Sequence, residues 1–131
     1  MKKVISILLV LTMAIGLAVI PAYASTYGLT EKTVTKVITH ADEIITDSIS
    51  VNLTVTLTGT YSLVATDQYS VMTSISAVKS GSLASAITLA TAKTGNNAYL
   101  RIKDTSGNLL RTFVYTINTS GYIYRSNVIV H

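Results

Sequence analysis

One ten-residue stretch, Ile49–Thr58, constrains the fold more than any other part of the chain. It reads Ile-Ser-Val-Asn-Leu-Thr-Val-Thr-Leu-Thr, so apolar side chains alternate strictly with polar ones. Because successive side chains of an extended chain point to opposite faces, this pattern predicts a strand with one apolar face and one hydroxyl-rich face. Such a strand needs neighbouring strands to pair its backbone and a second layer to cover its apolar face.

Further strands, separated by turn signals, are predicted along the rest of the chain. We expect them at Thr33–Thr39, Ile44–Leu57, Tyr61–Ala65, Tyr69–Val78, Leu83–Ala92, Ala98–Lys103, Leu109–Asn118 and Tyr122–Val130. Gly59 indicates a turn or a bulge. Seven or eight short strands at this spacing predict an all-β fold, a single antiparallel β-sandwich, with a small β-barrel as the alternative.

The first of these segments has a competing interpretation. Apolar residues recur at helical spacing from Val34 to Ile45, as in an amphipathic helix. Six of the seven residues in Thr33–Thr39 are β-branched, however, and such residues disfavour helices. A strand that ends between His40 and Glu43 is therefore preferred.

The clearest hairpin signal is the segment Asp104–Asn108. A three-residue loop with Gly107 in the left-handed conformation would pair Asp104 with Asn108. Continued without interruption, this register sets Arg101 directly opposite Arg111. Like charges that face each other across two strands are destabilising, so an anionic partner would relieve the pair.

The first 24 residues match a secretory signal peptide. Met1-Lys2-Lys3 is cationic, Val4 to Ile20 is uncharged, and Ala22-Tyr23-Ala24 resembles a cleavage site. A retained membrane anchor is the alternative, because the apolar stretch could nearly span a bilayer. We expect cleavage after Ala24, so that residues 25–131 form a single all-β domain that is secreted or held at the surface of a bacterial cell.

The composition of this expected mature chain excludes several classes of function. Without Lys2 and Lys3, eight Lys and Arg face six Asp and Glu, a net charge of +2, which is too small to favour nucleic-acid binding. The chain has no cysteine, so disulfides, thiol catalysis and cysteine-bound metals are excluded. Ser and Thr make up 32 of the 107 residues, a composition typical of an exported all-β protein.

Tyrosines and cations gather in the C-terminal third. From Tyr99 to Arg125 the only acid is Asp104, so this region carries a local charge of +3. Aromatic rings beside cations suit sugars or anionic envelope polymers, although aromatic cross-strand pairs and exposed arginines also occur for structural reasons alone. The residues predicted to bind are Tyr99, Arg101, Lys103, Arg111, Tyr115, Tyr122, Tyr124 and Arg125.

A second group of ionisable residues, His40, Asp42, Glu43 and Asp47, resembles neither a catalytic nor a metal site. A nearby Ser could complete a hydrolase-like set in composition, but no nucleophile-elbow motif accompanies it. Calcium binding by the three acids is conceivable, although their spacing does not match the twelve-residue calcium loop. A polar turn is the preferred interpretation, and no catalytic residue, metal or cofactor is predicted.

These patterns predict a non-enzymatic structural or adhesive protein. It would act by self-association or by binding anionic or polysaccharide polymers of the cell envelope. Long, weakly charged strands without proline favour strand-mediated association. The alternative is a secreted toxin or antimicrobial protein that inserts amphipathic strands into target membranes.

Overall fold

The structure, a computed structural model, describes residues 31–64 and 66–131. The predicted signal peptide and the cleavage site after Ala24 lie outside the described residues. So do residues 25–30, the predicted start of the mature domain.

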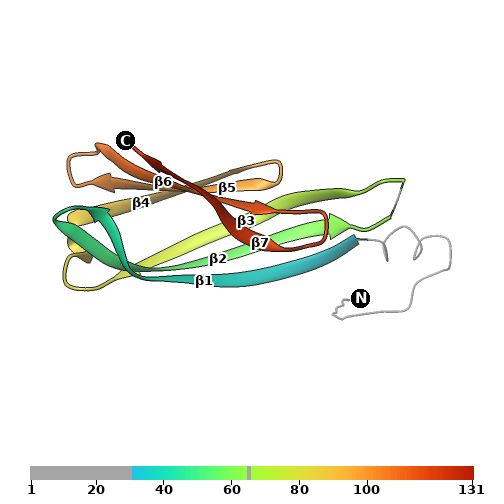
Figure 1. Cartoon of the computed structure of the whole chain (residues 1–131), viewed down its shortest axis with the longest axis horizontal. Helices are drawn as coiled ribbons and strands as arrows, with labels where there is room; N and C mark the ends of the chain where they lie inside the picture. Colours follow the sequence, from blue (N-terminus) through green and yellow to red (C-terminus); the bar gives the residue numbers. More distant parts are fainter. Residues whose placement is uncertain (1–30, 65) are drawn as a thin grey trace, which may run out of the picture. The chain divides into compact units, whose positions relative to one another are not determined.

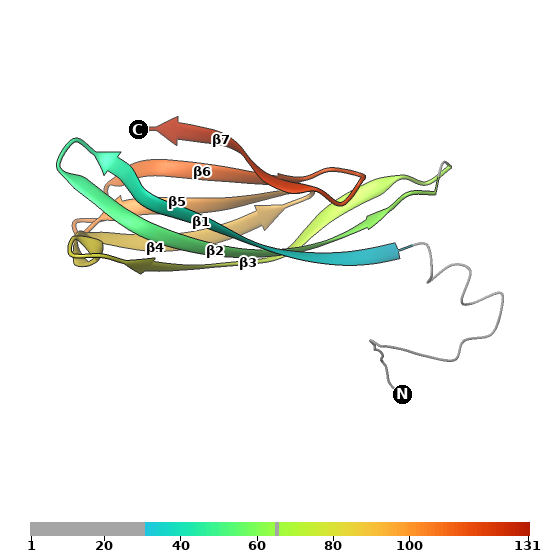
Figure 2. The ribbon, with the colours of Figure 1, turned by 60° about the horizontal axis from the view of Figure 1, so that its bottom comes forward.

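Within these described residues, seven strands form two antiparallel sheets (Figure 1). The first sheet contains β1 (Glu31–Thr46), β2 (Ile49–Ser62) and β3 (Tyr69–Ser80) in that order. The second contains β4 (Ile87–Thr94), β5 (Asn97–Asp104), β6 (Leu109–Ile117) and β7 (Ile123–Val130), also in order. A short 3₁₀ turn, η1 (Ala84–Ala86), precedes β4. Figure 2 shows the consecutive strands of each sheet lying side by side.

The core lies between the two sheets, and strand alternation determines which residues enter it. In β2, Val51, Leu53, Val55 and Leu57 are at most 2% exposed, while the intervening polar residues face outward. β5 and β6 complete the core by the same alternation, with Leu100, Ile102, Phe113, Tyr115 and Ile117 fully buried. The predicted antiparallel sandwich is therefore confirmed, and the described strands do not close into a barrel.

The two flanks of the sandwich are joined differently. At one flank, near the start of β3, the Met72 N–H donates to the Gly95 carbonyl at 2.8 Å, and the Ser70 hydroxyl donates to the Ile117 carbonyl at 2.9 Å. At the other flank, side chains of β1 contact side chains of β6 and β7. A site built from both sheets can therefore form beneath β1.

β1 is a strand and not a helix, as preferred, but it is longer than expected. A register shift between His40 and Glu43 marks a bulge, in which Asp42 has φ 50°. The bulge lets the strand continue through the acidic residues that were expected to end it. The turn comes at Asp47–Ser48, so the expectation that the second strand starts at Ile44 or Ile45 is wrong.

Two other boundaries differ from expectation. Gly59 lies at a bulge between β2 and β3 that leaves β2 uninterrupted to Ser62, so the strand expected at Tyr61–Ala65 does not start separately at Tyr61, and Ala65 lies outside the described residues. The segment Leu83–Ala86 forms a turn, and its strand starts only at Ile87. The β-branched residues of that segment begin at Ile87, whereas the alanines and serines before it favour a strand less.

The hairpin loop is confirmed, but its predicted register is wrong. The Asp104 N–H donates to the Asn108 carbonyl at 2.9 Å, and Gly107 has φ 90°. A bulge then shifts the pairing between Ile102 and Lys103, so Arg101 lies opposite Thr112 and Arg111 opposite Ile102. The extra residue, Leu110, moves the two arginines to opposite faces, and the predicted like-charge pair does not form.

Candidate functional site

The eight residues predicted to bind do not form one surface. The inner side of the second sheet contains Arg111, Tyr115 and Arg125, because each of them is paired across neighbouring strands with a buried core residue. Tyr99, Arg101 and Lys103 alternate with the buried residues of β5 and therefore point outward. Tyr124 is exposed on the edge strand β7, and Tyr122 is exposed just before that strand begins. These residues share a segment of the sequence but not a face of the sheet.

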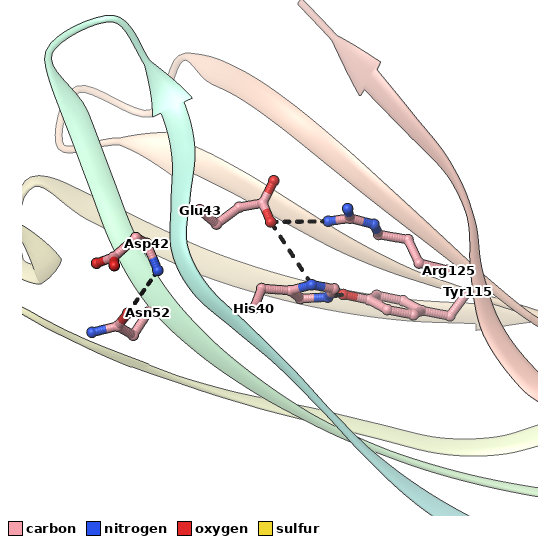
Figure 3. Close-up of polar contacts among 6 residues, drawn as sticks. All are labelled: His40, Asp42, Glu43, Asn52, Tyr115 and Arg125. Carbon is pink, nitrogen blue, oxygen red and sulfur yellow. Dashed lines mark hydrogen bonds and ion pairs between the residues drawn. The ribbon is translucent and has the colours of Figure 1, made fainter.

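The inner residues Tyr115 and Arg125 meet the acidic end of β1 in a polar cluster (Figure 3). Tyr115 is fully buried, and its hydroxyl lies 2.9 Å from His40 Nε2. On the other side of the imidazole ring, Nδ1 is 3.8 Å from Glu43 Oε1. The β1 bulge makes this possible, because it brings His40 and Glu43 to the same inner face three residues apart.

Arg125 completes the cluster from β7. Its Nη1 donates to Glu43 Oε1 at 3.2 Å, and its guanidinium lies 4.8 Å from the centre of the Phe113 ring. The His40 ring meets the same phenyl ring edge-on, with the centroids 5.5 Å apart. Both charges of the ion pair therefore have partners, as partly buried charges require.

Burial sets the protonation of the cluster. Desolvation lowers the pKa of His40, with Arg125 adding to the effect and Glu43 opposing it. Desolvation raises the pKa of the Tyr115 phenol well above its usual value. Both groups are therefore neutral near pH 7 and share one hydrogen bond. The polar side chains of the cluster bond to one another from strands of both sheets, so the cluster links the sheets.

The lowered pKa of His40 predicts that folding stability depends on pH. The unfolded chain binds a proton at His40 below about pH 6.5, whereas the folded chain binds it only at lower pH. The free energy of unfolding should therefore fall as the pH decreases from about 7 to about 5. Urea unfolding across this range measures the slope.

Two histidine variants test whether His40 causes the pH dependence of stability. His40→Gln should flatten the slope, while His131→Gln should retain it, because the His131 ring contacts Thr112 outside the cluster. An equally steep profile in His40→Gln would show that other groups cause the dependence.

The outer side of the second sheet carries the remaining predicted residues in register. Four cross-strand rows run over it: Thr94–Asn97–Thr116–Tyr124, Ala92–Tyr99–Val114–Asn127, Ala90–Arg101–Thr112–Ile129 and Thr88–Lys103–Leu109. We call this surface the Tyr/Arg face. Its charged members are two cations and no acid, so a positive potential is expected over it.

Aromatic rings and cations lie close together on and beside the Tyr/Arg face. The Arg101 guanidinium is 5.5 Å from the centre of the Tyr99 ring. At the β7 edge, Tyr122 and Tyr124 stack with their centroids 5.5 Å apart, and Lys36 Nζ lies 4.3 Å above Tyr122. The face and its β7 edge thus offer ring surfaces, positive charge and hydroxyl groups, which suit a flexible anionic or hydroxylated chain.

The acids weighed for calcium do not come together. Glu43 pairs with Arg125, whereas the Asp42 N–H binds the Asn52 side chain, and Asp47 lies in the turn after β1. Across residues 31–64 and 66–131, no three His, Cys, Asp or Glu side chains are grouped as metal ligands. In the same ranges, no helix is both long and apolar enough to cross a membrane.

Comparison with models of protein families, with curated proteins and with solved structures finds no match to this chain. The two groups of residues described above are therefore interpreted from their own geometry and chemistry.

Sequence reasoning missed the participation of His40 and Glu43 in a shared cluster with Tyr115 and Arg125. The available signal was strand alternation. Phe113, Tyr115 and Ile117 occupy every second position of β6, so Tyr115 belongs with the core and not with an exposed binding surface. The contact with β1 spans 75 residues between His40 and Tyr115, and local patterns carry no information about it.

Proposed function

We propose that this chain is a non-enzymatic adhesive protein that binds anionic polysaccharides of the cell envelope through its Tyr/Arg face. The observation that carries the proposal is the register of β5, which aligns Tyr99, Arg101 and Lys103 on one outward face. The expected export of the mature chain would bring this face into contact with such polymers.

The chemistry of the face matches that partner in three ways. Tyrosine rings provide flat surfaces on which sugar rings can stack, and their hydroxyls can bind sugar hydroxyls. Arg101 and Lys103 attract carboxylates or phosphates without an acid among the rows to compete. Thr116 and Asn97 already share a hydrogen bond of 2.8 Å, so the adjoining polar groups are held in place.

The geometry gives no comparable support for catalysis. The Tyr/Arg face is the outer side of a sheet, with its ionisable side chains spread along β5, and the inner cluster uses its polar groups to bind one another. Catalytic groups normally converge on one substrate position in a water-excluding pocket. A binding role therefore fits the described residues better than an enzymatic one.

Electrophoresis through native gels that contain a polysaccharide tests the proposal. Alginate, a polymer of uronic acids, should retard the protein, and neutral dextran should retard it much less. Arg101→Glu should weaken binding to alginate about tenfold, since it replaces an attractive charge with a repulsive one. Lys32→Glu makes the same charge change on exposed β1 and is the matched control.

Two results would refute the proposal. One is the absence of retardation by alginate at low ionic strength, where surface charge interactions are strongest. The other is an equal effect of Arg101→Glu and Lys32→Glu, which would mean that net charge alone controls the mobility.

A further inference from the structure

The outer side of the first sheet has a different chemistry from the Tyr/Arg face. Beyond the end row Glu31–Ser62–Tyr69, which carries one acid, five cross-strand rows form one uncharged surface: Thr33–Thr60–Val71, Thr35–Thr58–Ser74, Val37–Thr56–Ser76, Thr39–Thr54–Val78 and Asn52–Ser80. We call this surface the hydroxyl face. Its rows contain hydroxyls, one amide and three valines, and none of these side chains is charged.

We infer that the hydroxyl face binds the hydroxyl face of a second copy of this chain, so that two sandwiches pair back to back. This inference goes beyond the proposed polysaccharide binding, since it concerns the opposite sheet and a different partner.

The hydroxyl face is chemically suited to bind a second copy of itself. A two-fold contact sets the same patch against itself, so the patch must be made of groups that can bind one another. Hydroxyl groups can, because each both donates and accepts hydrogen bonds, and Thr35 and Thr58 already pair in this way at 3.0 Å. Uncharged rows add no like-charge repulsion, whereas the Tyr/Arg face would repel a second copy of itself.

Exposed apolar groups supply a driving force on the same face. Val37 is 56% exposed and Val78 is 67% exposed, on the two strands that flank β2. Removing these side chains from water favours association. Between them, the β2 threonines present a methyl group and a hydroxyl each, so that apolar and polar contacts can form side by side.

The size of the face predicts a weak pair. Three strands are roughly 14 Å wide, and the nine β2 residues from Asn52 to Thr60 are about 30 Å long, which gives a flat area of about 400 Å² per copy. Two copies together approach the roughly 1,000 Å² at the lower limit of specific interfaces. Association should therefore be reversible, with a dissociation constant in the micromolar range or weaker.

Sedimentation velocity of the purified protein, expressed from the full chain, over about 1 µM to 1 mM tests the inference. The wild type should shift from monomer to dimer as its concentration rises. Thr54→Lys adds a charge at an exposed position of the central strand and should weaken association at least tenfold, because each variant pair brings two added lysines into one small contact. Thr88→Lys adds the same charge to the exposed outer side of β4 and should change it less than twofold.

Circular dichroism and thermal unfolding establish that each variant is folded. If Thr54→Lys does not fold, Val37→Lys on β1 provides the same test at a position with an already exposed side chain. A wild type that remains monomeric at about 1 mM overturns the inference, as does an equal loss of association in the β2 and β4 variants. Neither result bears on polysaccharide binding by the Tyr/Arg face.

Discussion

Replacing Phe113 by alanine should lower the free energy of unfolding by about 3–5 kcal/mol, the range observed for large aromatic side chains removed from cores. Phe113 is fully buried between the sheets. Its ring supports the edge-on His40 ring and the Arg125 guanidinium, so the substitution removes packing and leaves two polar groups above a cavity. Urea unfolding measures the change, and the melting temperature should fall by more than about 10 °C.

Val114→Ala is the matched control, because it shortens the next side chain on β6, which faces outward and is only partly buried. It should cost less than about 1 kcal/mol. An equal decrease in the free energy of unfolding in both variants would indicate that the inner side of β6 packs no more tightly than its outer side, which would contradict the burial of Phe113.

Replacing Gly121 by alanine should destabilise the fold by about 2–4 kcal/mol, from backbone strain and steric overlap together. Gly121 has φ 83°, a left-handed conformation that L-residues adopt at a cost. A β-carbon added here would also overlap the ring of Tyr61, which belongs to the other sheet. Denaturant unfolding of the variant measures the sum of both effects.

Gly107→Ala separates the two effects. Gly107 has a similar φ of 90°, but an added β-carbon would meet no atom within 4 Å. This variant should cost only about 1–2 kcal/mol, the strain alone. If Gly121→Ala were no more harmful than Gly107→Ala, Tyr61 would have to move aside without loss, and the turn before β7 would not be packed against the first sheet.

The architecture followed from the sequence wherever alternation was long and regular. Ile49–Thr58 indicated which residues of β2 enter the core, and Asp104 with Gly107 indicated the hairpin loop. These features depend on local geometry alone, which neighbouring residues determine.

Bulges account for most of the errors. The extra residue Leu110 shifted the register of β5 and β6, and the bulge before Glu43 let β1 continue where an end was expected. One inserted residue reverses the face of every residue beyond it. Local sequence gives weak warning of a bulge.

The candidate site was predictable in composition but not in arrangement. The sequence drew attention to the tyrosines and cations after Tyr99, but Tyr115 and Arg125 contact His40 and Glu43 of β1 instead of facing solvent. Such partners are far apart in the chain. Only the packing of one sheet on the other determines which of them meet.

The sandwich carries its two outer surfaces on different sheets, so they point away from each other. A pair of copies joined through β1, β2 and β3 would leave two cationic surfaces directed outward in opposite directions. We expect such a pair to act as a bivalent cross-linker, which holds two polymer strands at once and gains avidity from weak individual contacts. A domain that carried the hydroxyl face and the Tyr/Arg face on the same sheet would lack this capacity, because pairing would cover the surface proposed to bind the polymer.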